Sequence, residues 1–485
     1  MNSRATHRWW VLGALMISMI VVGLDSTVLN VALPTLATRL HASTSQLQWI
    51  VDAYILVLAG VVVFTAGSLT AAFAGSPGWL IATRAVMGVG AAIILSVPLA
   101  VLPTIFTPEG RPRAIATVMV AMGLGLPLGP IVGGWLLQHF WWGSVFLVNV
   151  PVGALAVAAL ALLLPDSRDT AAERSDLVGA ALSTAGLVAL VYGVVEAPDR
   201  GWTSGDALGF GGLGVALLVG FAWWERRIDH PMIDLSLLAR PRFGWGTLCA
   251  TIASFAMLGM LFVLPLYLQA VRGYDPLGTG VRLLPMIGGL IVGAKAGERA
   301  IARLGSRVPI VVGLGVILAG LVWGSTVSVG TGYPTMAGWL TLLGLGMGLT
   351  MTPAMDAALG EVPPARAGSG SALTMALRQV GGALGVAVLG SVLNAVYTHR
   401  LDDGGLPAGA AAAARESVAA GLAVARTAGS TALASSATDA YVHAMSVVML
   451  TSAGFAVLGM VVAATAMPAR AAAQTPREES ATIAS

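Results

Sequence analysis

The chain alternates between long apolar runs and short polar stretches. An apolar run of about 20 residues can cross a bilayer as a helix, and such runs recur along nearly the whole chain. They predict an all-α membrane protein with 13 or 14 spans. The expected spans are Trp9–Leu33, Leu47–Gly75, Leu80–Phe106, Ile115–Phe140, Val145–Leu164, Leu177–Ala197, Ala207–Trp224, Phe243–Gln269, Val281–Leu304, Val308–Val329, Met336–Leu359, Leu373–Tyr397 and Met445–Ala466.

The run Leu47–Gly75 does not fit one ordinary crossing. As a single helix it would be about 44 Å long, against a hydrocarbon core of about 30 Å. As two spans of about 21 Å each it would leave a turn at Gly60 without hydrogen-bond partners, unless other helices cover that turn. A continuous helix satisfies its own backbone, and Gly60 costs it only about 1 kcal/mol. We therefore expect one long helix, tilted or kinked.

The placement of the arginines favours the opposite interpretation of this run. If the run turns back on itself, sixteen arginines lie on one side of the membrane and six on the other. The positive-inside rule then places the arginine-rich side, with both termini, in the cytoplasm. A single helix instead places the N-terminus outside, so charge and backbone hydrogen bonding give conflicting answers.

The composition supports the membrane assignment. Hydrophobic residues make up 56% of the chain, charged residues 10%, and the mean hydropathy is +0.84, whereas soluble domains are about 25% charged. The 61 glycines allow helices to approach closely in lipid. The net charge of +3 does not indicate nucleic-acid binding, because the arginines lie in short loops. The single cysteine, Cys249, excludes an intramolecular disulfide.

Two of the expected spans, Leu177–Ala197 and Ala207–Trp224, lie between two polar connectors near the middle of the chain. The alanine-rich stretch before the last span is expected to be partly helical and to lie outside the membrane on the outer side. The expected divisions are a first transmembrane bundle (1–165), a connector with two extra spans (166–230), a second bundle (231–469) with an outer loop (398–443), and a disordered cytoplasmic tail (470–485).

Asp25 is the first candidate functional residue. It lies about 24 Å along the helix that starts at Trp9, beyond the centre of the bilayer. A carboxylate at the centre of a span costs roughly 2.5–3.5 kcal/mol on insertion scales, and such groups normally face a bundle interior or a watery cavity. We expect Asp25 to carry a proton or bind a cation. The alternative is a hydrogen bond to a neighbouring helix.

Four other charged residues inside predicted spans are candidates: Asp52, Arg84, Asp356 and Arg378. Arg84 stays charged at physiological pH and would lower the pKa of a nearby carboxyl group; alternatively, it snorkels to the outer interface. Asp356 and Arg378 either pair across helices, or Asp356 is solvated near the inner end of its span. Asp52 is either an exposed end charge or a ligand.

The sequence contains no Walker loop, nucleophile elbow or clustered metal ligands. It therefore gives no support for an enzyme, a cofactor or a metal site.

Small residues form a regular pattern in the span Ile115–Phe140. Gly125, Gly129 and Gly133 recur every four residues, so one face of the helix lacks side chains and another helix can approach it closely. Pro130 removes a backbone hydrogen bond and bends the helix, and Gly134 follows the stripe. The face either forms a tight seam between the two bundles or serves as ordinary small-residue packing.

Taken together and in order, four stretches resemble the drug:proton antiporters of the major facilitator superfamily, in particular their fourteen-span branch. The two additional spans and the long outer loop also fit that branch. The stretches are Leu24–Pro34 at the end of the first span, Trp49–Tyr54 at the start of the run Leu47–Gly75, Arg84–Ala92 in the span Leu80–Phe106 and Gly123–Gly134 in the span Ile115–Phe140. In the family these correspond to spans 1, 2, 4 and 5.

The resemblance implies the major-facilitator fold, with a central cavity between two bundles. It also implies proton-coupled efflux of amphipathic or cationic drugs across the cytoplasmic membrane by alternating access, and hence antibiotic resistance. The expected partners are a small amphipathic substrate, a proton and the lipid bilayer, and the expected state is a monomer. In that scheme Asp25 carries the proton or binds the cation, Arg84 modulates it, and Gly125–Gly134 forms the seam.

The chain departs from the family at one point. The family joins spans 2 and 3 by a cytoplasmic loop that carries a glycine, an aspartate and several arginines. Here the uncharged stretch Ala59-Gly60-Val61-Val62 leads directly from one to the other. Two alternatives to multidrug efflux are therefore kept: a dedicated exporter of one endogenous metabolite or antibiotic, and a remnant that no longer transports.

Cysteine labelling tests the fate of the run Leu47–Gly75. In a Cys249→Ala background, an impermeant reagent applied from outside is expected to label Ser3→Cys, because one helix places the N-terminus outside. Protection of Ser3→Cys, with Ser167→Cys also protected, would instead show that the run turns back and that both termini are cytoplasmic.

Overall fold

The computed structural model of the chain describes residues 61–105, 128–154, 176–201, 203–228, 235–360, 362 and 367–468. All regular elements in these ranges are helical, as the sequence predicts. They are α3 (Val61–Ala72), α4 (Pro77–Ile105), α6 (Ser144–Leu147), α8 (Leu177–Arg200), α9 (Gly205–Glu225), η1 (Leu235–Ala239), α10 (Pro241–Leu266), η2 (Tyr267–Val271), α11 (Pro276–Arg282), α12 (Leu284–Leu304), α13 (Arg307–Gly324), α14 (Tyr333–Leu359), α15 (Ala367–Arg400), α16 (Ala408–Glu416), α17 (Val418–Thr427) and α18 (Thr431–Ala466). Residues 128–139 and 149–154 are also helical.

Within these ranges, 8 helical segments are long and apolar enough to cross a membrane. Each of them corresponds to a span expected from the sequence, beginning with the pair between the bundles. The segments are Val178–Ala197, Gly205–Glu225, Pro241–Val271, Pro276–Leu304, Arg307–Gly324, Tyr333–Leu359, Leu373–Arg400 and Thr431–Ala466.

The structure describes the run Leu47–Gly75 only from residue 61 onward. The expected end at Gly75 is wrong, because α3 ends at Ala72 and a turn leads into α4. The next helix also begins earlier than expected, at Pro77 instead of Leu80. Ser76 accounts for this early start, because its Oγ accepts the backbone N–H of Trp79 at 3.2 Å. Whether the run is one helix or two lies outside the described residues.

In the first half, α3 is held against both of its described neighbours. A side chain at Gly90 of α4 would overlap Phe64 of α3, so these two helices touch through their backbones. On another face of α3, Ser68 Oγ donates to the Phe146 carbonyl oxygen at 2.8 Å and accepts from Asn149 Nδ2 at 3.1 Å. The Ser68 hydroxyl, the Phe146 carbonyl and the Asn149 amide are all buried, and a buried polar group without a hydrogen-bond partner would cost free energy.

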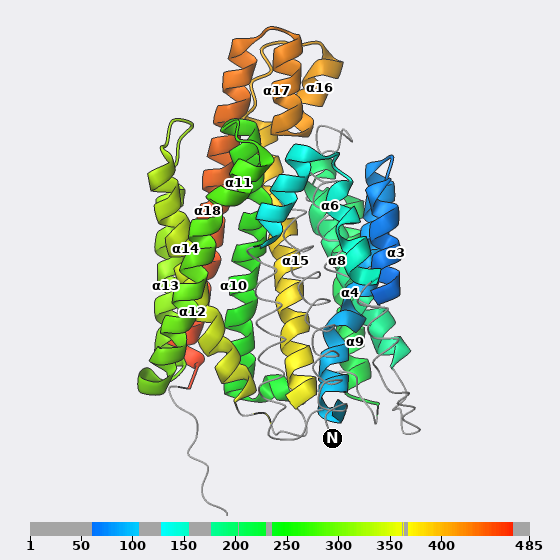
Figure 1. Cartoon of the computed structure of the whole chain (residues 1–485), viewed down its shortest axis with the longest axis vertical. Helices are drawn as coiled ribbons and strands as arrows, with labels where there is room; N and C mark the ends of the chain where they lie inside the picture. Colours follow the sequence, from blue (N-terminus) through cyan, green and yellow to red (C-terminus); the bar gives the residue numbers. More distant parts are fainter. Residues whose placement is uncertain are drawn as a thin grey trace, which may run out of the picture.

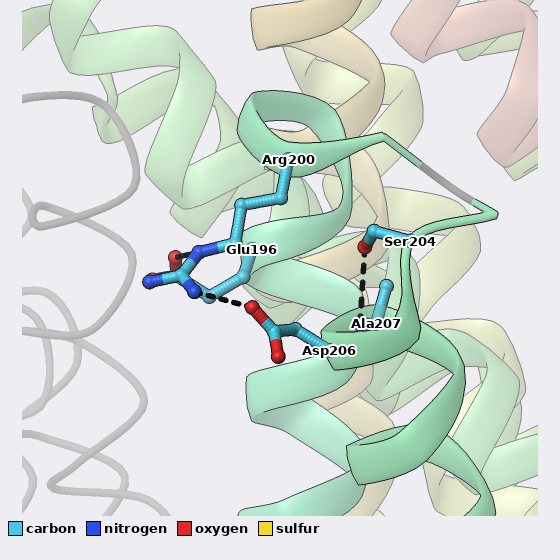
Figure 2. Close-up of polar contacts among 5 residues, drawn as sticks. All are labelled: Glu196, Arg200, Ser204, Asp206 and Ala207. Atoms are coloured by element: carbon cyan, nitrogen blue, oxygen red, sulfur yellow. Dashed lines mark hydrogen bonds and ion pairs between the residues drawn. The ribbon is translucent and has the colours of Figure 1, made fainter.

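The two additional spans, α8 and α9, form a hairpin that is fixed at its tight turn. Figure 2 shows Arg200 between two carboxylates, with Nε 3.1 Å from Glu196 and Nη1 2.6 Å from Asp206. The hydrogen bond to Asp206 is the main cause that raises the pKa of Arg200. Ser204 Oγ accepts the backbone N–H of Ala207 and so caps the start of α9.

The other end of the hairpin, where α8 begins and α9 ends, is also held by hydrogen bonds. In addition, α8 contacts the second half. Asp176 caps α8 by accepting the backbone N–H of Gly179 at 2.9 Å, and this bond lowers the pKa of Asp176. The indole Nε1 of Trp224 in α9 donates to the same carboxylate at 3.0 Å. Ser391 Oγ of α15 donates to the Val194 carbonyl oxygen of α8 at 2.9 Å, which joins the hairpin to the second half.

The second half is built around α10, which packs against α14, α15 and α18. Its buried side chains include Phe262 and Tyr267, and Trp339 of α14 is the largest fully buried side chain of the described residues. Tyr441 of α18 donates its hydroxyl to the Val263 carbonyl oxygen of α10 at 2.9 Å. A polar tip buried this deeply needs such a partner.

Where α12 and α14 cross, both helices contribute glycines to the contact. A side chain at Gly289 would overlap the carbonyl oxygen of Thr341, and one at Gly344 would overlap the carbonyl oxygen of Met286. Gly293 and Gly348 repeat the arrangement one turn further along. Both helices therefore carry a Gly-x-x-x-Gly face, and these two faces meet.

The alanine-rich stretch before the last span forms a cap, defined here as α16, α17 and residues 431–444 of α18. It stands beyond the ends of the other helices (Figure 1). Tyr397 Oη donates to the carbonyl oxygens of Ala414 and Ser417 at 3.0 and 3.3 Å, which fixes α16 and α17 to α15. The last helix starts at Thr431 instead of Met445, because residues 431–444, nearly four turns, are too polar to be recognised as part of a span.

Neighbouring glycines of α12 provide a matched test of this packing. Gly289→Val is expected to destabilise the protein by about 1–3 kcal/mol, because overpacking a closed contact costs that much. Gly288→Val is the control, since nothing lies within 4 Å of a side chain at this position. Thermal unfolding in detergent measures both. Equal melting temperatures for the two variants would show that the α12–α14 crossing tolerates a side chain.

Candidate functional site

The two halves meet where residues 128–139 contact α11. A Cβ atom at Gly134 would lie 2.6 Å from both the Leu277 Cα and the Pro276 carbonyl oxygen. From the other side, a Cβ atom at Gly280 would overlap the Pro130 carbonyl oxygen. The halves therefore touch backbone to backbone at the end of the molecule that carries the cap (Figure 1).

Four of the five residues expected at this seam lie in the described residues, and all four are buried: Gly129, Pro130, Gly133 and Gly134. Pro130 and Gly134 make the contacts just described. Gly125 lies outside the described residues. The sequence did not predict α11, the helix that this seam contacts, because the span there was expected to begin at Val281 and not at Pro276.

The contacting helix α11 is a short piece separated from α12 at Leu283. Asp275 caps it by accepting the backbone N–H of Gly278 at 2.9 Å. At its other end the Arg282 guanidinium lies 3.7 Å from the centre of the Tyr274 ring and 5.5 Å from that of Tyr333. Such cation–π contacts contribute about 0.5–2 kcal/mol each. They hold α11 against the start of α14.

Arg84 is deeply buried in α4, with 1% of its surface exposed. It lies about 10 Å along the helix from Pro77. Its guanidinium is 5.8 Å from the centre of the Phe146 ring, and Nη1 is 3.9 Å from Met87 Sδ. The side chain is thus enclosed by the first half and does not snorkel to the surface.

Asp356 and Arg378 have different partners and do not pair with each other. Ser306 Oγ donates to Asp356 Oδ2 at 2.7 Å and lies 3.5 Å from Arg242 Nη2, so this cluster joins the ends of α10, α13 and α14. Arg378 Nε donates to Ser254 Oγ at 3.4 Å, between α15 and α10. The sequence placed both charges in spans but gave no means of choosing their partners.

Two further candidates, Asp25 and Asp52, lie outside the described residues. Among the residues that are described, no three histidine, cysteine, aspartate or glutamate side chains are placed to hold a metal ion. What the described residues show at the seam is a contact between two backbones, at Gly134 with Pro276 and Leu277 and at Gly280 with Pro130.

Comparison with known proteins identifies the family. The model of the Major Facilitator Superfamily matches residues 53–386. This chain belongs to the Major Facilitator Superfamily. It is therefore a multi-pass membrane transporter of small molecules and not an enzyme.

Several relatives of this major-facilitator protein are named as resistance or export proteins. The tetracenomycin C resistance and export protein of Streptomyces glaucescens is 34% identical over 408 residues, which cover 79% of this chain and 76% of the relative. The puromycin resistance protein of Streptomyces alboniger is 34% identical over 429 residues, covering 83% and 85%. The multidrug resistance protein Stp of Mycobacterium tuberculosis H37Rv is 34% identical over 412 residues, covering 80% and 76%.

Solved structures agree on the fold. A bacterial homologue of the human lysosomal transporter Spinster, in an inward-facing and occupied conformation, superposes with a TM-score of 0.67 at 17% identity. That superposition covers 95% of this chain and 97% of the other. A mutant of the nucleoside transporter NupG gives a TM-score of 0.57 at 11% identity, covering 95% of this chain and 100% of the other. The major-facilitator fold expected from the sequence is confirmed.

The seam can be tested by placing a side chain in it. Gly134→Leu is expected to lower the transport rate at least about tenfold, because the leucine side chain prevents the two halves from closing. A tenfold loss of rate corresponds to about 1.4 kcal/mol of activation free energy. Gly209→Leu on α9 is the control, because nothing lies within 4 Å of that position. Transport is followed as dye efflux in membrane vesicles, with protein levels compared by immunoblot. Full activity of Gly134→Leu would mean that the contact is not needed for transport.

Proposed function

We propose that this transporter exports amphipathic or cationic drugs across the cytoplasmic membrane in exchange for protons. The observation that carries the proposal is the similarity, over about four-fifths of the chain, to proteins named for multidrug or antibiotic resistance. The α8–α9 hairpin between the halves supports membership of the fourteen-span drug:proton antiporter branch.

The geometry of the seam supports alternating access. A transporter that exposes its cavity to one side at a time needs a closed contact at the other end. The contact of Gly134 with Leu277, and of Gly280 with Pro130, closes the end that carries the cap. By the distribution of arginines this end faces outward, so the conformation is closed to the outside.

In the proposed cycle Asp25 carries the proton. A carboxyl group in a span titrates according to two opposing influences: desolvation raises its pKa, and a nearby cation lowers it. Arg84, buried in α4, is the proposed cation. Exposure of the cavity to one side and then the other would change the desolvation and let the proton on and off. Asp52, Asp356 and Arg378 are proposed to assist substrate or proton coupling.

The missing loop between spans 2 and 3 remains part of the proposal. The alignment with the tetracenomycin protein extends over 408 residues. It covers 79% of the 485 residues of this chain, and that share amounts to fewer than 408 residues. The relative therefore has residues without a counterpart here. The alignment with the puromycin protein behaves in the same way. This supports a deletion, and with it the alternative of a remnant that no longer transports.

A dedicated exporter is the second candidate. It is favoured by relatives whose names refer to a single antibiotic: tetracenomycin C, puromycin and, in a probable transporter of Streptomyces coelicolor at 32% identity, actinorhodin. Such a protein would carry one compound of its own producer instead of many drugs.

Uphill efflux from everted vesicles, with a panel of cationic dyes and antibiotics, separates these functions. Multidrug export predicts that several unrelated compounds move and that each releases protons. Movement of a single compound supports the dedicated exporter, and no flux with any compound supports the remnant.

Asp25→Asn tests the coupling residue in the same vesicles. It is expected to abolish uphill efflux while the protein stays in the membrane, because an amide forms hydrogen bonds but does not titrate. Asp403→Asn is the control: it removes only a surface ion pair with Arg415, which contributes little. Undiminished uphill efflux by Asp25→Asn would exclude Asp25 from proton coupling.

A further inference from the structure

An open cavity of about 790 Å³ lies between the end of α15 and the part of α18 that belongs to the cap. Its walls combine charged and polar groups with small apolar side chains. It is lined by Ala395, Val396, His399, Arg400, Ser436, Asp439, Ala440, His443 and Val447. None of these residues takes part in the seam or in the proposed coupling.

The cavity holds two opposite charges that do not pair with each other. Arg400 stands in the last turn of α15 and Asp439 on α18. Within the described residues these two side chains form no ion pair, and Asp439 accepts only a long hydrogen bond of 3.4 Å from Ser435 Oγ. Two unpaired opposite charges in one cavity fit a ligand that carries both charges itself. His399 and His443 add ring N–H donors to the same walls.

The cavity lies at the level where α13 ends. Ser446, between His443 and Val447 of the cavity lining, donates its Oγ–H to the Ser325 carbonyl oxygen at 2.7 Å, in the turn that ends α13. From there α18 continues into the membrane with one exposed face. The exposed or half-exposed positions recur every three or four residues, so they form one stripe: His443, Val447, Leu450, Gly454, Val457 and Val461.

This stripe runs from the cavity along the apolar part of α18. The side chains of Leu450 and Val461 are 52% and 50% exposed. In a bilayer, an exposed apolar helix face contacts acyl chains. The cavity and the stripe therefore form one continuous surface with a charged head and an apolar stem.

We propose that this surface binds a zwitterionic phospholipid of the ethanolamine type from the leaflet next to the cap. The lipid phosphate would accept hydrogen bonds from Arg400 and the two histidines, and the primary ammonium would donate to Asp439. The acyl chains would lie along the stripe below His443. This site is separate from the proposed transport pathway and does not depend on it.

Lipid affinity of the purified full-length protein tests the proposal. Ethanolamine, choline and glycerol phospholipids with identical acyl chains are titrated in detergent, and binding is measured by native mass spectrometry. The ethanolamine lipid is expected to bind about tenfold more tightly than the choline lipid, the difference that one charge-assisted hydrogen bond supplies. A quaternary ammonium has no N–H to donate to Asp439.

Two variants assign the charges. Arg400→Gln is expected to weaken all three lipids, and Asp439→Asn is expected to remove the preference for ethanolamine and to favour the anionic glycerol lipid. Arg426→Gln is the control, since this exposed arginine lies in the last turn of α17 and does not line the cavity.

Three results would overturn the proposal. Equal affinities of the wild-type protein for the three lipids would contradict recognition of the head group. The same loss in Arg426→Gln as in Arg400→Gln would show a general charge effect. Equally tight binding of phosphoethanolamine without acyl chains would show a soluble ligand instead of a lipid.

Discussion

Close approach of helix backbones is the interaction on which the described structure depends. Lipid tails are as apolar as leucine, so helices gain little hydrophobic free energy by associating in a bilayer, and packing has to supply the difference. Glycines meet glycines or carbonyl groups at the α12–α14 crossing and at the seam. The crossing repeats over successive turns of both helices, whereas the seam involves one short helix. The first contact therefore ties two helices of one half together over several turns, whereas the second joins the two halves over a small area.

Much of the fold follows from the sequence, because lipid imposes a simple rule. A helix that satisfies its own hydrogen bonds must be long and apolar to cross, and the eight described spans all obey that rule. The structure differs from the predicted spans at features that leave no mark on the apolar pattern. The break between α11 and α12 and the π-helical turn Tyr267–Val271 after Pro265 leave the apolar pattern unchanged. The early part of α18 is helical although its polar residues do not indicate a span.

The candidate site is less accessible to sequence reasoning, since it depends on which faces meet. The glycine repeat Gly125, Gly129 and Gly133 drew attention to this helix, and the printed contacts with α11 lie one residue further on, at Pro130 and Gly134. Gly280 was missed because the pattern of one helix does not specify its partner. In the same way, Ser306 and Ser254 are uncharged residues that gave no signal, yet they bind Asp356 and Arg378. The buried Arg84 likewise lies near Phe146, which is distant in the sequence.

The unbroken helix α18 has a mechanical consequence. It passes from the end of the second half far from the cap, through the membrane and into the cap without interruption. Residues 431–444 project about 20 Å beyond the start of the apolar part. A rigid rod acts as a lever, so a tilt of about ten degrees within the membrane moves the tip by about 4 Å in water. A tilt of α18 would therefore displace the cap further than it displaces the apolar part of the same helix.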